Sequence, residues 1–153
     1  MTWLYAPGAL AADDHAAHSH ESHAAHGEPQ ALSLNNGKKW ITDEPLRRGM
    51  GNIRDAIERH RHVTHAGKPT AAQYTTLAKN IHAEAGYIFQ NCKLDKKADE
   101  ALHVILADVL SSAAAIEGRQ KGVSRERGVA RVAGALDRYG RSFDHSGWEP
   151  ANK

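Results

Sequence analysis

The chain has 153 residues, with 41% hydrophobic and 25% charged side chains and a mean hydropathy of −0.60. This length suits one domain with a hydrophobic core, and no run approaches the roughly 20 apolar residues that a membrane-spanning helix needs, so we expect no stable membrane insertion. The net charge is +2 without a dense basic stripe, which argues against nucleic-acid binding. The single cysteine excludes an internal disulfide framework or a Cys-rich zinc module, whereas eleven histidines are an unusual number.

Residues 1–11 have features of the end of a secretory signal peptide. A short apolar stretch ends in Ala-Leu-Ala at residues 9–11, the small-x-small pattern of a signal-peptidase site, with no basic residues before it. We therefore expect a signal-peptide remnant, export to the periplasm, and a mature chain that starts near Ala12 or Asp13. The alternative is a frayed terminus in a chain that is not exported.

Residues 12–31 form a low-complexity tail that is rich in histidine. Because no large apolar side chain is available for burial, we expect this tail to be disordered without a ligand. Its five histidines are His15, His18, His20, His23 and His26. Neutral imidazole suits Cu, Zn and Ni, and spacings of two and three residues let a flexible chain place several rings around one ion. The tail predicts metal binding of low specificity; a solvated polar tract or an engineered tag is the alternative.

Four amphipathic segments follow within the predicted domain of residues 32–150. The expected helices run from Thr42 or Asp43 to Gly67, from Thr70 to the turn at 93–95, from Asp95 to Gly118, and from Ser124 to about Ser146. Trp40 and Ile41 are expected to lie against the bundle end as a lead-in segment, and no strand pattern competes. Since loops of a few residues favour antiparallel neighbours, we predict an all-α, up-down-up-down four-helix bundle.

The last predicted helix contains three glycines, Gly128, Gly134 and Gly140. Each costs about 1 kcal/mol relative to alanine in a helix interior. They indicate either a close approach between helices or room for a bulky group, and the sequence leaves both interpretations open.

Counting outward from the turns places Met50, Cys92, His103 and His145 toward one end of the bundle. Met50 and His103 lie at a similar level, and Cys92 and His145 lie about six residues, or about 9 Å, nearer that end. Sulfur donors with imidazole favour copper, especially Cu(I), over hard cations. The sequence thus predicts a copper-type site from these residues or from a Met50/His103 or Cys92/His145 pair. The alternative is structural, because Met and Cys commonly fill cores and a neighbour can satisfy an imidazole.

The opposite end of the bundle carries His60, His62 and His65. His60 lies on the core-facing row, whereas His62 and His65 are three residues apart and share another face. Cationic histidine near a helix C-terminus interacts favourably with the helix dipole, and this is sufficient to explain why histidines occur there. A metal-binding role is the alternative. His82 is expected to pack at the margin of the second helix.

Motifs of familiar enzyme chemistry do not occur in the sequence. It has no HExxH, no CxxCH for covalent haem, no glycine-rich phosphate loop, no G-x-S-x-G and no repeated Glu-x-x-His of a di-iron bundle. The acidic residues at the predicted helix starts are explained by the helix dipole. We therefore expect no enzymatic activity.

Three stretches carry a resemblance to known proteins: GKKWITDEPLRRGMGNIRDAI, NCKLDKKADEALH and RYGRSFDHSGW. They resemble a group of exported proteobacterial helical-bundle proteins, some labelled DnrO-like, over about residues 34–150, and that group has no established activity to carry over. The chain also resembles the soluble periplasmic b-type cytochromes. This second resemblance implies non-covalent haem held by Met50 and His145, although His145 lies at or past the end of its helix.

Three functional hypotheses follow from these observations. The first is a periplasmic, non-enzymatic protein that captures or buffers Cu, Zn or Ni with its tail and passes copper to the Met/Cys/His site. The second is a haem b electron carrier that uses Met50 and His145. The third is a structural or interaction bundle in which the tail is incidental. The sequence leaves open the metal, a transfer partner and a homodimer.

Overall fold

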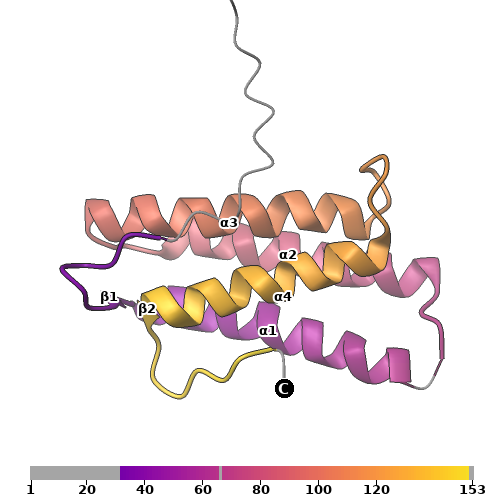
Figure 1. Cartoon of the computed structure of the whole chain (residues 1–153), viewed down its shortest axis with the longest axis horizontal. Helices are drawn as coiled ribbons and strands as arrows, with labels where there is room; N and C mark the ends of the chain where they lie inside the picture. The colour runs from indigo at the N-terminus through magenta and orange to yellow at the C-terminus, as the bar shows by residue number, and fades with distance from the viewer. Residues whose placement is uncertain (1–31, 66, 152–153) are drawn as a thin grey trace, which may run out of the picture. The chain divides into compact units, whose positions relative to one another are not determined.

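The computed structural model describes residues 32–65 and 67–151, with the side chain of His65 left out. Within them it contains α1 (Glu44–His65), α2 (Ala71–Asn91), α3 (Lys96–Ile116) and α4 (Arg125–Ser142), which confirms the expected helical fold class (Figure 1). The signal remnant predicted at 1–11 and the tail predicted at 12–31 lie outside the described residues. In the part that the structure describes, no helix is long and apolar enough to cross a membrane.

Local hydrogen bonds fix where the helices begin. Asp43 accepts from the backbone N–H of Leu46 at the start of α1, and Asp95 accepts from two N–H groups at the start of α3. Thr70 forms a capping box with Gln73 before α2, and Ser124 caps α4. These side chains satisfy N–H groups that have no partner inside a helix, which is why the predicted starts agree with the structure within a residue or two.

The core lies between the helices and is built from their apolar rows. The fully buried side chains include Leu46, Met50, Ile53 and Ile57 of α1, Ile81 and Ile88 of α2, Leu102, Ile105, Leu106 and Ile116 of α3, and Tyr139 of α4. Neighbouring helices in the chain contact one another, and α1 also contacts α4. The rows predicted from helical spacing therefore face a common core.

Contacts between helix ends show which termini meet. At one end, Asp43 before α1 bonds to the backbone of Lys93 after α2, and Thr42 donates to the carbonyl of Asp144 after α4. At the other end, the ring of His60 in α1 packs on Tyr74 in α2, 4.8 Å between centroids. The start of α1 thus lies beside the ends of α2 and α4.

A two-residue parallel ladder closes the first of these ends, and the sequence did not predict it. β1 (Trp40–Ile41) pairs with β2 (Phe143–Asp144), with Trp40 opposite Phe143. Trp40 is buried as expected, but the expectation for Ile41 is wrong, because its side chain is 76% exposed. Successive side chains of a strand point to opposite faces, so only one of the two can reach the core.

The structure gives different roles to the helical glycines. A Cβ on Gly128 would lie 2.9 Å from the backbone nitrogen of Ile116, so α3 and α4 approach closely there. A Cβ on Gly140 would lie 2.4 Å from the indole of Trp148, so this glycine makes room for a side chain of the same protein. Around Gly134 nothing lies within 4 Å of the added Cβ. The interpretation as a close helix approach is therefore correct at Gly128, and the interpretation as room for a bulky group is correct at Gly140.

Candidate functional site

The end of the bundle where β1 and β2 pair contains the bundle-end cluster, which we define as Asp43, Cys92, Tyr139 and His145. Asp43 is the central acceptor: its carboxylate lies 2.9 Å from the N–H nitrogen of Leu46, 2.6 Å from that of Lys93 and 3.4 Å from the Cys92 sulfur. One carboxylate thus joins the start of α1 to the end of α2.

Burial and hydrogen bonding oppose each other at Asp43. Burial acts to raise the pKa of its carboxyl, whereas the N–H groups of Lys93 and Leu46, the Cys92 thiol and the Arg47 charge lower it, and the net direction is downward. Hydrogen bonds to a carboxylate favour its charged form. Asp43 is therefore an anion at neutral pH.

The same surroundings keep Cys92 protonated. Burial, followed by the Asp43 charge and hydrogen bond and by the Asp99 charge, raises the pKa of the thiol to about 12. Since the thiolate is the form that binds metals and attacks electrophiles, this thiol is poorly prepared for either task. Cys92 is half-buried at the end of α2 and forms no disulfide in the described structure.

His145 is held by aromatic neighbours just beyond α4. Its Nδ1 lies 2.9 Å from the hydroxyl oxygen of Tyr139, and its ring packs on Trp148 with 4.9 Å between centroids. Burial, and after it the charges of Arg47 and Arg54, lower the pKa of the imidazole. The Nε2 atom is the ring nitrogen not engaged by Tyr139.

The other two predicted copper ligands lie in different surroundings. Met50 is fully buried in the core of α1. His103 lies on an exposed part of α3, where its Nδ1 donates to the Asp99 carbonyl 2.8 Å away and its ring centroid is 5.6 Å from that of Phe89. The structure thus places His145 against Tyr139, and burial and the nearby Cys92 raise the pKa of the Tyr139 hydroxyl. His103 contacts Asp99 and Phe89 instead.

Among the described residues, no group of three or more His, Cys, Asp or Glu side chains is placed to hold a metal ion. A four-residue copper site and the Cys92/His145 or Met50/His103 pairs stay predictions. The haem hypothesis also stays a prediction: Met50 is packed among core side chains, and His145 is occupied by Tyr139 and Trp148, so haem binding would require both to repack.

Other histidines of the bundle have separate neighbours. His82 Nε2 lies 3.6 Å from the Glu117 carboxylate, at the margin of α2 as expected. His62 is exposed on α1. His60 is buried with 7% of its surface exposed and packs on Tyr74, whose hydroxyl donates to Glu126 at 3.0 Å.

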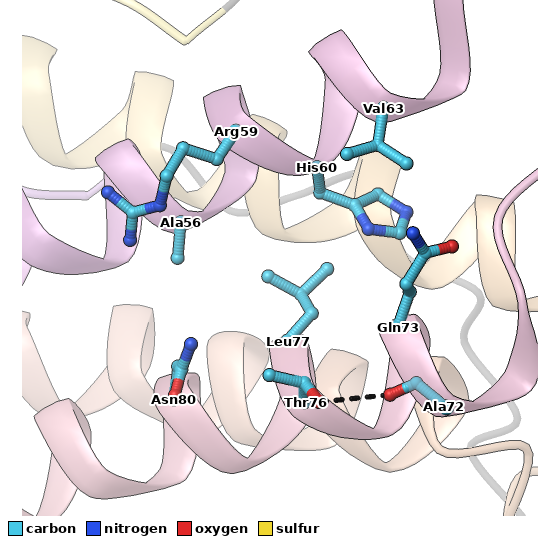
Figure 2. A pocket seen from close by; sticks show the side chains of 9 residues that line it. All are labelled: Ala56, Arg59, His60, Val63, Ala72, Gln73, Thr76, Leu77 and Asn80. Carbon is cyan, nitrogen blue, oxygen red and sulfur yellow. Dashed lines mark hydrogen bonds between the residues drawn. The ribbon is translucent and has the colours of Figure 1, made fainter. Parts of the chain in front are cut away.

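An open groove between α1 and α2 is the feature that the sequence did not reveal. Its volume is about 300 Å³, and Figure 2 shows the side chains that line it. Apolar lining comes from Ala56, Val63 and Leu77, and polar lining from Arg59, His60, Gln73 and Asn80. The position of His60 on the core-facing row was the one sequence feature that pointed to this region. The groove itself could not be predicted, because it depends on how α1 and α2 face each other.

Comparison of the chain with protein-family models, curated proteins and solved structures finds no match. The resemblances to exported proteobacterial bundle proteins and to b-type cytochromes therefore stay predictions. The five tail histidines, His15, His18, His20, His23 and His26, lie outside the described residues.

Proposed function

We propose that this protein captures or buffers Cu, Zn or Ni ions with the histidines of residues 12–31, carried on a four-helix bundle. The observation that carries the proposal is the five histidines within residues 15–26 of the sequence. Imidazole binds these borderline metals, and a chain without large apolar side chains can wrap around an ion. The role is binding, without catalysis.

The surroundings of the bundle histidines support the assignment of metal binding to the tail. His60, His82, His103 and His145 each pack on a different neighbour, and the described residues contain no cluster of three potential ligands. Metal capacity therefore falls to the tail. Transfer of copper to Cys92 or His145 is a further step of the same proposal and would have to overcome the Asp43 and Tyr139 hydrogen bonds.

We further infer that the four helices follow an up-down-up-down order and that the protein acts in the periplasm. The contacts of Asp43 with Lys93 and of Thr42 with Asp144 support an up-down-up-down order of the helices. The small-x-small pattern at residues 9–11 supports export, and the periplasm is where an exported bundle of the resembled group would meet metal ions.

The test is a variant in which all five tail histidines are changed to Gln, purified without an affinity tag. Equilibrium dialysis against Zn²⁺, Cu²⁺ and Ni²⁺ should show that the variant binds at least one ion fewer per chain, with unchanged helical circular dichroism. Binding to the parent protein should weaken below about pH 6, because protons compete for imidazole.

A matched control carries His62→Gln, a change at an exposed histidine of the bundle that lies outside the predicted copper site. It should retain the parent stoichiometry. Equal stoichiometry in the tail variant and the parent would overturn the proposal.

A further inference from the structure

The groove between α1 and α2 has the dimensions of a site for a small molecule. Its lining extends from Ala56 to Val63 on α1 and from Ala72 to Asn80 on α2, which is about two helical turns or roughly 10 Å. A volume of about 300 Å³ is at the lower limit of ligand pockets, which lie at about 300–1,000 Å³. The groove therefore suits a ligand of about one ring and a short side chain.

The charge of the groove favours an anion. Arg59 lines it with an exposed side chain, and this guanidinium takes part in none of the ion pairs found among the described residues. None of the lining side chains is acidic. The nearby Glu126 influences His60 electrostatically, but its carboxylate accepts a hydrogen bond from Tyr74. Arg59 is thus available to a carboxylate, with which a guanidinium can form two parallel hydrogen bonds.

The imidazole of His60 provides the second observation. The side chain is 7% exposed, its Nε2 atom is buried, and this atom has no hydrogen-bond partner among the described residues. Figure 2 shows the ring projecting from α1 into the space between the helices, on the side of Gln73, whereas Arg59 extends toward the side of Ala56 and Asn80. A buried polar group without a partner is unfavourable by about 1–3 kcal/mol, so a ligand hydroxyl gains by pairing with this nitrogen when the ring turns to expose it to the groove.

We propose that the α1–α2 groove binds a small phenolic carboxylate. The carboxylate lies at Arg59, with Asn80 beside it, and the aromatic ring lies on Leu77. The phenol hydroxyl donates to the imidazole of His60 near Gln73. Because burial lowers the pKa of His60, the imidazole is neutral at pH 7 and keeps an acceptor nitrogen. This inference does not depend on metal binding by the tail.

The experiment is calorimetric titration of the full chain with three probes that share one ring. Para-hydroxyphenylacetate carries both groups, phenylacetate lacks the hydroxyl, and tyramine replaces the carboxylate with an ammonium group. We expect para-hydroxyphenylacetate to bind most tightly, phenylacetate several-fold more weakly, and tyramine not at all. Amide chemical-shift changes should be concentrated at Ala56, Val63, Thr76 and Leu77.

Two variants and a matched control keep the result interpretable. Arg59→Gln should weaken binding of both carboxylates about tenfold, the scale of one charge-assisted interaction. Lys79→Gln removes the same charge from an exposed position outside the groove and should have no effect. His60→Phe keeps an aromatic ring on Tyr74 and should abolish the preference for the phenol.

Three outcomes would overturn the inference: equal binding of tyramine, equal binding by the Arg59→Gln and parent proteins, or shift changes that map away from α1 and α2. If His60→Phe does not fold, the probe series and Arg59→Gln still test the inference. The Arg59 side chain is exposed, so its substitution should leave the fold intact. Since no arm of the experiment contains a metal, its failure is independent of the result for the tail.

Discussion

Gly128 lies where the backbones of α3 and α4 meet. A methyl group there would stand 2.9 Å from the Ile116 nitrogen and 3.0 Å from the Ser112 carbonyl oxygen. Backbone atoms of a packed helix cannot turn aside as a side-chain end can. Gly128 therefore lowers the intrinsic helix propensity of α4 but allows close packing between α3 and α4.

We expect Gly128→Ala to destabilise the protein by about 1–3 kcal/mol, because the two helices must separate to admit the methyl group. Thermal denaturation followed by circular dichroism measures this change.

Gly134→Ala in the same helix is the matched control. Nothing lies within 4 Å of its added Cβ, so it should stabilise α4 by about 0.5–1 kcal/mol. If both alanine variants were equally stable, the close contact at Gly128 would be disproved.

At the scale of the element, a capping residue can also connect helices that are distant in sequence. Within the described residues, the Asp95 carboxylate accepts only from its own helix, from the N–H groups of Lys97 and Ala98. Asp43 caps α1 through Leu46 and also accepts from the backbone of Lys93, 50 positions later. The loop between α2 and α3 is thereby attached to the start of α1.

Asp43→Ala is expected to lower the unfolding free energy by about 2–3 kcal/mol, since it removes a cap and leaves the Lys93 N–H without its charged acceptor. Asp95→Ala, which removes a cap alone, should lower it by about 1 kcal/mol. Urea denaturation at neutral pH compares the two variants, and a smaller effect at Asp43 than at Asp95 would contradict the connecting role.

At the scale of the whole described bundle, the buried His60 and the half-buried His145 lie at opposite ends. His60 faces Tyr74 and Glu126, and burial lowers its pKa although the Glu126 charge raises it. His145 lies among Tyr139, Trp148 and the charges of Arg47 and Arg54. In the unfolded chain both imidazoles would titrate near their ordinary value of 6.5.

Because both pKa values are lower in the folded state, the unfolded chain binds more protons as the pH falls through 6.5. The stability that these histidines contribute is fully present above this value and is lost as the pH falls toward their folded pKa values. The urea midpoint should therefore decrease from neutral pH to about pH 5.

His60→Phe isolates one of the two contributions, because it retains a ring at the Tyr74 contact without a titratable group. Its urea midpoint should decrease less on acidification than that of the parent. A parent protein that became more stable over the same range would contradict the expected linkage.

Helix starts could be predicted because their causes are local, whereas the predicted end of the last helix at about Ser146 is wrong, because α4 ends at Ser142 and the chain then pairs with β1. Asp95 and Ser124 each accept from N–H groups two or three residues later, so the pattern and the bond lie in one short stretch. The apolar row from Leu46 to Ile57 is likewise a local repeat, and the structure buries all of it. The predicted position of His60 followed from the same repeat, and that of His82 followed from the corresponding repeat of α2.

The sequence by itself therefore determined the four helices, their caps and the residues of the core. Only the tertiary structure decided that Trp40 and Ile41 pair with Phe143 and Asp144, and that His145 binds Tyr139. It also decided that Gly140 accommodates Trp148 and that α1 and α2 leave a groove. Helical periodicity sets which face of a helix is apolar. The rotation and spacing of one helix against another depend on side chains far apart in the chain, and these set the contacts of each candidate ligand.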